Sequence, residues 1–160
     1  MKRVLALYML VTTAALSPAR AEMTVEAARS TVAPFYKALN AAFAPQSADL
    51  IRQATAPDWT SCRENDVCSG RDEVIAGVAA RLKSVPDLTW QIKDVAVAGN
   101  QVTVRGEATG KPAGPFMGAA YSGKSFKVMS IDIHTIENGR MVRSYHVEDW
   151  IGAVRQLSTE

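Results

Sequence analysis

Residues 123–149, GKSFKVMSIDIHTIENGRMVRSYHVED, form the stretch that decides the fold of this chain. Two runs rich in β-branched and aromatic residues lie on either side of Asn138-Gly139. Asn-Gly between such runs is the strongest short signal for a β-hairpin, because both residues tolerate the positive φ angles of a two-residue turn. The stretch therefore predicts two antiparallel strands joined at Asn138 and Gly139.

The register of this hairpin follows from the turn, which places Glu137 opposite Arg140. Counting back predicts three further pairs: His134 with Arg143, Asp132 with Tyr145, and Ser130 with Val147. Side chains alternate along a strand, so one face should carry Val128, Ser130, Asp132, His134 and Ile136, with Met141, Arg143, Tyr145, Val147 and Asp149. The other face should carry Met129, Ile131, Ile133 and Val142, with Ser144, His146 and Glu148.

The first face combines two carboxylates, an imidazole and a phenol, and this asymmetry is the main functional clue in the sequence. One hypothesis is that these groups face a ligand. The other is the default for antiparallel sheets, in which one face is dry and the other is solvated. The same register places His146 on the opposite face, so it is not among the candidate functional residues.

The first 21 residues have the pattern of a cleaved signal peptide. Lys2 and Arg3 precede an uncharged apolar run, and Ala19-Arg20-Ala21 suits a signal peptidase. The run is shorter than the about 20 apolar residues that a membrane span needs. We expect cleavage after Ala21 and export to the periplasm or medium, with an uncleaved anchor as the alternative.

Removal of residues 1–21 takes away three positive charges and leaves a chain whose length fits a single domain, residues 22–160. The formal charge of +2 therefore comes from the leader. Without a positive excess, the mature chain has no electrostatic basis for binding nucleic acid. We see no later transmembrane segment and expect no membrane contact after cleavage.

Cys62 and Cys68 are the two cysteines of the chain. An even count in an exported protein favours a disulfide between them. A metal site is the alternative, but no histidine is near in sequence, and the spacing does not match a Cys-x-x-Cys redox pair. We expect no metal and no cofactor.

Three helices are predicted before the strands. Thr24 can cap a helix that runs to about Phe43 with Pro34 inside it, and Ser47 can cap a second helix through Ala54. A third helix follows Asp72 and ends before Pro86. A short helix from Trp150 to Leu157 should close the chain.

An earlier hairpin is predicted between residues 87 and 109, with its turn at Gly99-Asn100. Apolar alternation changes phase between Ile92 and Val95, which suggests a bulge or a strand covered on both sides. A simple register places Asp94 opposite Arg105 and Ile92 opposite Glu107. Four antiparallel strands under three helices describe an α+β cone with a cavity, where a small ligand would bind.

Residues 110–122, GKPAGPFMGAAYS, should form a loop because of their glycines and prolines. Phe116, Met117 and Tyr121 are unusual side chains for such a loop. They suit either a lid over the cavity or packing on the rim of the core.

Several motifs together resemble the SnoaL-like polyketide cyclase (ester cyclase) family: PDLTW at 86–90, GPFMG, SGK at 122–124, IDIH at 131–134, ENGRMV and YHVEDW at 145–150. The resemblance covers nearly all of the mature chain. It implies the nuclear-transport-factor-2-like α+β cone, commonly dimeric through the sheet. It also implies cofactor-free aldol cyclisation, with Asp149 matching the acid/base aspartate and His134 matching the pocket histidine.

The chemistry that these residues allow is proton removal next to a carbonyl group, with donors that hold the enolate oxygen. Asp149 is the candidate base, Tyr145 and a protonated Asp132 are candidate oxyanion donors, and His134 or Arg105 could polarise the carbonyl. Further pocket candidates are Trp59, Trp90, Arg105, Glu107, Phe116, Met117, Tyr121 and Ser130. The expected ligand is a small hydrophobic carbonyl compound.

Three functions remain open from the sequence. The first is an exported cyclase or isomerase, and the second is a non-catalytic module that binds a small apolar ligand. The third is an interaction domain that pairs through its sheet as a homodimer and needs no pocket chemistry.

Overall fold

The computed structural model describes residues 22–158, and the predicted signal peptide, residues 1–21, lies outside this range. Within it the protein is α+β. The helices are α1 (Val25–Ala38), the 3₁₀ helix η1 (Ala41–Gln46), α2 (Ser47–Ala54), α3 (Arg71–Ser84) and α4 (Trp150–Ser158). The strands are β1 (Thr55–Cys62), β2 (Cys68–Gly70), β3 (Thr89–Ala98), β4 (Gln101–Gly110), β5 (Phe126–Glu137) and β6 (Arg140–Glu148).

The six strands form one mixed sheet in the order β2-β1-β6-β5-β4-β3. All neighbouring strands are antiparallel except β1 and β6, which are parallel. The prediction of a four-stranded, purely antiparallel sheet is therefore wrong. The segment around Trp59, whose sequence suggests a loop or a short extended piece, forms β1 and extends the sheet beyond β6.

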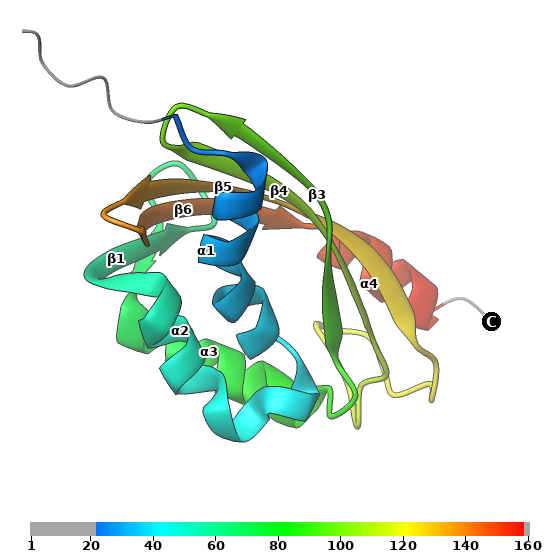
Figure 1. Cartoon of the computed structure of the whole chain (residues 1–160). Helices are drawn as coiled ribbons and strands as arrows, with labels where there is room; N and C mark the ends of the chain where they lie inside the picture. Colours follow the sequence, from blue (N-terminus) through cyan, green and yellow to red (C-terminus); the bar gives the residue numbers. More distant parts are fainter. Residues whose placement is uncertain (1–21, 159–160) are drawn as a thin grey trace, which may run out of the picture.

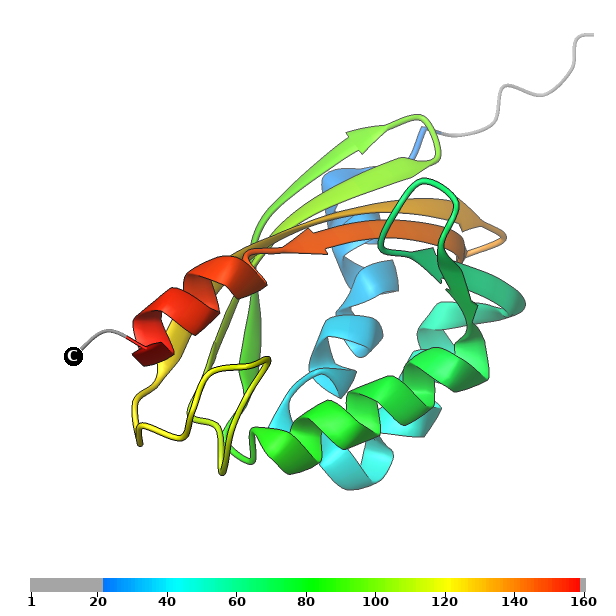
Figure 2. The ribbon, with the colours of Figure 1, turned by 180° about the vertical axis from the view of Figure 1, so that it is seen from behind.

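The sheet is strongly curved, and α1, α2 and α3 lie on its concave side (Figures 1 and 2). The predicted order of elements is only partly correct, because α3 follows β1 and β2 in the chain. The short C-terminal helix is confirmed as α4, which lies at one end of the sheet beside the loop of residues 111–125 (Figure 2).

Local signals fix the helix ends. The Thr24 hydroxyl accepts a hydrogen bond from the Ala27 amide at 3.1 Å, so the predicted N-cap of α1 is confirmed. The first helix ends at Ala38, before the predicted Phe43, and Pro45 lies within η1. The second helix has the predicted bounds, although Ser47 is its first residue and its hydroxyl donates to Ala38 O.

The β3–β4 hairpin turns at Gly99 and Asn100 as predicted, and Asp94 faces Arg105. The backbone of Lys93 has no ladder partner on β4, because Ile92 pairs with Gly106 and Asp94 pairs with Arg105. The extra residue shifts the alternation of side chains along β3. As a result, Trp90 before the bulge and Val95 after it both pack against the same core. Ile92 therefore faces Gly106, and the predicted pairing with Glu107 is wrong.

The β5–β6 hairpin turns at Asn138 and Gly139, whose φ angles are 50° and 73°. The predicted pair of Glu137 with Arg140 is confirmed, but the register changes beyond Ile136 and Met141. Val142 has no ladder partner on β5. From Thr135 back to Ser130, each β5 residue therefore faces the β6 residue that follows the predicted one in the sequence. The observed pairs are His134 with Ser144, Ile133 with Tyr145, Asp132 with His146, and Ser130 with Glu148.

This one-residue shift exchanges the faces of β6. Ser144, His146 and Glu148 share the concave face with Asp132 and His134, whereas Tyr145 lies on the outer face with Ile133. The predicted pairing of Asp132 with Tyr145 and the placement of His146 on the opposite face are both wrong.

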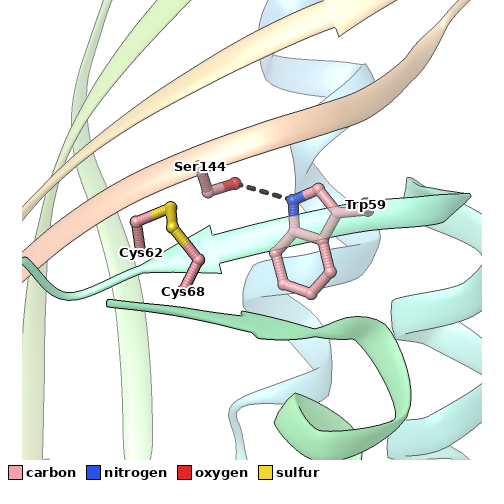
Figure 3. The surroundings of a disulfide bond; sticks show 4 residues. All are labelled: Trp59, Cys62, Cys68 and Ser144. Atoms are coloured by element: carbon pink, nitrogen blue, oxygen red, sulfur yellow. Dashed lines mark hydrogen bonds between the residues drawn. A yellow bond between two sulfur atoms is a disulfide. The ribbon is translucent and has the colours of Figure 1, made fainter. Parts of the chain in front are cut away.

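The predicted disulfide between Cys62 and Cys68 is present, and it joins directly paired residues of β1 and β2 (Figure 3). On the same strand Trp59 is fully buried, and its indole N–H donates to Ser144 Oγ at 2.9 Å (Figure 3). Within residues 22–158, the helices are too short or too polar to cross a membrane.

Candidate acid/base site in the cavity

A cavity of about 750 Å³ lies between the concave face of the sheet and the helices α1 and α3. This volume is within the usual range for small-molecule sites. Apolar residues from α1, α3 and the start of β3 form much of its wall: Phe35, Leu39, Val74, Val78, Leu82 and Leu88. The polar groups come mainly from β5 and β6: Asp132, His134, Ser144, His146 and Glu148.

Asp132 is the most buried carboxyl group in the cavity wall, with 4% of its surface exposed. Burial raises its pKa to about 7, and the negative charge of Glu148 adds to the rise. Hydrogen bonds from Tyr36 and Ser130 and the charge of His146 act in the opposite direction. A carboxyl group with this pKa exchanges protons readily near neutral pH.

His146 lies beside this carboxyl group and is paired with Glu148. The distance between His146 Nδ1 and Glu148 Oε1 is 2.8 Å, and this hydrogen bond is the main cause of the raised pKa of His146. The other carboxylate oxygen of Glu148, Oε2, accepts the indole N–H of Trp150 at 3.2 Å. Both oxygens of Glu148 are therefore engaged within the protein.

Asp132, His146 and Glu148 also form the one group of potential metal ligands among residues 22–158, with ligand atoms within 4.8 Å of one another. One imidazole and two carboxylates are a donor set that suits a divalent transition metal. The same closeness of a carboxyl group with a raised pKa to an imidazole also suits proton transfer.

His134 is fully buried, and burial lowers its pKa to about 3. It therefore stays neutral near pH 7. Its Nδ1 lies 2.8 Å from Ser144 Oγ, and its Nε2 lies 2.9 Å from the hydroxyl of Tyr36. Burial also raises the pKa of Tyr36, with a further contribution from Asp132, so its phenol keeps its proton.

These contacts join into one chain of hydrogen bonds that ends at Asp132. Trp59 can only donate, so Ser144 Oγ accepts its N–H and is free to donate its own proton to His134 Nδ1. With the Nε2–H tautomer, His134 donates to Tyr36, whose own hydroxyl proton can then point toward the Asp132 carboxylate and lower the pKa of that group. The chain positions Asp132 and stabilises its charged form.

Two hydrogen-bond donors of the cavity wall, Arg81 Nη1 and Trp90 Nε1, are buried without a partner among residues 22–158. Arg81 comes from the last turn of α3 and lies over the ring of Trp150, with 4.4 Å between Cζ and the ring centroid. Unpaired buried donors are costly, and this makes them candidates for ligand contact.

Asp149, the candidate base from the family resemblance, lies outside the cavity. It is exposed, and its Oδ1 accepts the Gly152 amide at 2.8 Å, so it acts as the N-cap of α4. Tyr145 is 38% exposed on the outer face. Of the four predicted catalytic residues, the structure brings Asp132 and His134 together and leaves Asp149 and Tyr145 outside.

The predicted pocket residues divide in the same way. Trp90 and Met117 line the cavity, and Ser130 donates to Asp132 Oδ2 at 3.2 Å. Trp59 and Phe116 are buried in the core, where Phe116 stacks on Phe126 with ring centroids 5.6 Å apart.

Three further predictions for the pocket are wrong. Tyr121 is 57% exposed and does not line the cavity. Arg105 and Glu107 alternate with the buried residues of β4 and so lie on the outer face. There they pair with Asp94 and with Lys93 and Lys127 respectively.

Sequence reasoning missed five polar residues of the site: Tyr36, Arg81, Ser144, His146 and Glu148. The motif YHVED contains two of them, and a one-residue bulge was the only information lacking for His146 and Glu148. Tyr36 and Arg81 come from helices far away in the sequence, and no local pattern connects them with β5.

Comparison with known proteins agrees with this architecture. The family model of the SnoaL-like polyketide cyclases matches residues 33–157. A search of curated proteins finds no match.

Among solved structures, a candidate SnoaL-like polyketide cyclase from Jannaschia sp. CCS1 aligns with a TM-score of 0.73 and 22% identity over 90% of this chain and 99% of its own. IdmH from Streptomyces antibioticus, a candidate polyketide cyclase, aligns with a TM-score of 0.70 and 22% identity, over 81% of this chain and 97% of the IdmH chain. TsrD from Streptomyces laurentii aligns with a TM-score of 0.67 and 26% identity, over 81% of this chain and 96% of the TsrD chain. The chain therefore belongs to the SnoaL-like polyketide cyclase family.

Proposed function

We propose that this protein is a cofactor-free acid/base catalyst that moves a proton next to a carbonyl group of a small, largely apolar molecule. The observation that carries the proposal is the Asp132 carboxyl group, which is buried in the cavity wall with a pKa of about 7. Aldol cyclisation and isomerisation both begin with this proton removal. The family supports this class of reaction, since its members include candidate polyketide cyclases.

Asp132 takes the role of the base. Its carboxylate removes a proton from the carbon next to the carbonyl group, and the electrons of the C–H bond form an enolate. The enolate carbon then attacks a second carbonyl group, or, where the enolate is conjugated with a further double bond, a different carbon takes the proton back from Asp132. In the first case the proton on Asp132 goes to the new alkoxide, so that Asp132 returns to its starting state.

His146 has the role of the electrophilic partner. It is paired with Glu148, which favours the imidazolium form, and it is the direct neighbour of Asp132 across the sheet. A cation or donor here lowers the energy of the enolate oxygen as its charge develops. His134 has a different role, because its neutral ring positions Tyr36 and, through it, Asp132.

The enolisation of 2-tetralone in D₂O tests this proposal, because that ketone is apolar and has acidic protons next to its carbonyl group. Proton NMR follows the loss of the α-proton signal. We expect the wild-type protein to exchange these protons faster than buffer does, and Asp132→Asn to lose about 100-fold of that rate.

Asp149→Asn is the matched control. Asparagine is an equally good N-cap, so α4 should stay intact and the exchange rate should remain within about twofold of wild type. Undiminished exchange in Asp132→Asn, or loss of exchange in Asp149→Asn, contradicts the assignment of Asp132. Tight binding of 2-tetralone without any exchange above buffer favours the alternative function, a non-catalytic ligand carrier.

We also propose that the protein acts after export and as a homodimer through the outer face of its sheet. The leader supports the first part, and the Cys62–Cys68 disulfide is consistent with an oxidising compartment. The second part is supported by exposed apolar side chains on the outer face of β5 and β6: Met129, Ile133 and Tyr145. A cluster of this kind on one face is typical of an interaction surface.

A further inference from the structure

We propose that Arg81 and Trp90 form an anion-binding subsite in the cavity, and that the ligand is therefore a carbonyl compound that also carries a free carboxylate. The inference deepens the proposed function, but it rests on that function only in taking the cavity as the ligand site. It follows from how each of the two donors is placed.

Arg81 is a half-buried cation whose Nη1 atom is fully buried, and it has no counter-ion among residues 22–158. The ion pairs formed among residues 22–158 do not include it, and its Nη1 has no hydrogen-bond partner there. Burial lowers the pKa of the guanidinium, which shows that the surroundings disfavour its charge. A buried charge of this kind is stable when an anion is paired with it.

Glu148 is the obvious counter-ion, but it is already engaged. Its Oε1 pairs with His146, and its Oε2 accepts the N–H of Trp150. Glu148 lowers the electrostatic cost of Arg81 from a distance without forming an ion pair with it. The guanidinium therefore keeps donors available for a group that enters the cavity.

Trp90 supplies the second unused donor. Its side chain is buried, and its indole N–H has no acceptor among residues 22–158. The nitrogen lies 2.8 Å from the position that a Cβ of Gly106 would occupy, and Ser130 Oγ lies 2.5 Å from the same position. Because Gly106 has no side chain, the indole nitrogen of Trp90 can occupy this space beside Ser130. The hydroxyl of Ser130 in turn donates a hydrogen bond to Asp132.

Trp150 holds the two donors in one region of the cavity. The guanidinium of Arg81 lies over its ring, and the ring of Trp90 meets it edge-on with centroids 6.3 Å apart. Stacking fixes the plane of a guanidinium, and a planar guanidinium binds a carboxylate through two parallel hydrogen bonds. A carboxylate anchored here lies in the same cavity as the Asp132 carboxyl group.

The test compares 2-naphthoic acid with its methyl ester, which lacks the negative charge and carries one more methyl group, by calorimetric titration near neutral pH. We expect the ionised acid to bind at least about tenfold more tightly than the ester. Arg81→Gln should remove that preference and leave ester binding unchanged. Trp90→Phe, which removes the unused N–H together with the five-membered ring of the indole, should weaken acid binding by about three- to tenfold relative to its effect on ester binding.

Arg105→Gln is the matched control, because Arg105 is a cation on the outer face that pairs with Asp94. It should not change the binding of either probe. Ester binding by Arg81→Gln also reports an intact cavity, so misfolding and loss of the subsite are distinguished.

Three outcomes overturn the proposal: equal affinity for acid and ester, absence of binding by the acid, or an acid preference that survives Arg81→Gln. Asp132→Asn separates this inference from the proposed function. We expect that variant to bind the acid at least as tightly as wild type, whatever its effect on proton exchange.

Discussion

Asp132 and His146 are direct partners across the β5–β6 ladder, and both side chains line the cavity. One is a carboxyl group that burial makes less acidic, and the other is an imidazole that Glu148 makes more basic. Their opposite charges are therefore coupled at the pH where the protein is expected to act. The proposed chemistry depends on this pair.

The exchange rate should rise with pH through about 7, because the base must be ionised and the pKa of Asp132 is about 7. His146→Gln should move the midpoint of this rise to higher pH, since the positive charge of His146 lowers the pKa of Asp132. The measurement is the pH profile of α-proton exchange in 2-tetralone. A profile that is flat between pH 5 and 9 would falsify the role of Asp132 as the base.

Asp132→Asn should stabilise the protein at high pH. The carboxyl group has a raised pKa in the folded state, so the folded protein binds more protons than the unfolded chain between about pH 4 and 7. Stability is thereby lost as the pH rises through this window. We expect the variant to gain a few kcal/mol over wild type at pH 8 and to lose that advantage near pH 4.

Urea unfolding of both proteins at pH 8, 6 and 4 measures this difference. Subtracting the two free energies of unfolding cancels titrations that the proteins share, including that of His134. A difference that does not change with pH contradicts the raised pKa.

Ser144→Ala should cost about 1–3 kcal/mol, because it leaves the Trp59 indole N–H and His134 Nδ1 without partners in the core. A second substitution, Trp59→Phe, removes the indole N–H that Ser144→Ala leaves without an acceptor. The double variant should therefore be more stable than the sum of the two single effects. Ser125→Ala, which removes a hydroxyl at an exposed position, is the control. If the free-energy changes of the two single variants simply add up in the double variant, the Ser144 hydroxyl and the Trp59 indole are not coupled.

Replacing both cysteines by alanine should lower the free energy of unfolding by about 2 kcal/mol, since the disulfide closes a short loop in the unfolded chain. Denaturant unfolding of the double variant gives this number. Wild-type protein treated with a reductant should show the same loss. An unchanged midpoint under both conditions means that the bond contributes nothing to stability.

Ile133→Lys should convert the proposed dimer into a monomer, because it places a charge on the apolar outer face where Ile133 pairs with Tyr145. Light scattering coupled to size-exclusion chromatography measures the mass. Val25→Lys is the matched control, as Val25 is an exposed apolar residue on α1, which lies on the concave side of the sheet (Figure 1). A monomeric wild-type protein, or a dimer that survives Ile133→Lys, contradicts the proposed interface.

The elements that follow from local signals could be predicted from the sequence. Asn138-Gly139 fixed one turn, Gly99-Asn100 fixed the other, and Thr24 fixed the start of α1. Each of these depends on a few adjacent residues whose backbone preferences agree with the fold.

The composition of the site could not be predicted in the same way. Val142 carries no sequence signal of a bulge, and yet its extra residue decides which half of β6 faces the cavity. Tyr36 meets His134 across 98 positions of sequence, and this contact depends on how α1 packs against the sheet. Long-range packing of this kind overrides the simple count of residues from a turn.

The bulge at Val142 also has an evolutionary consequence. Loss of that single codon would remove the bulge and keep the pairs His134–Ser144 and Asp132–His146. A strand that kept Val142 in an uninterrupted ladder would instead direct Arg143 and Tyr145 inward in place of Ser144 and His146. Only this second change replaces an imidazole by a phenol opposite Asp132, so the bulge, and not the length of the strand, sets the chemistry of the cavity.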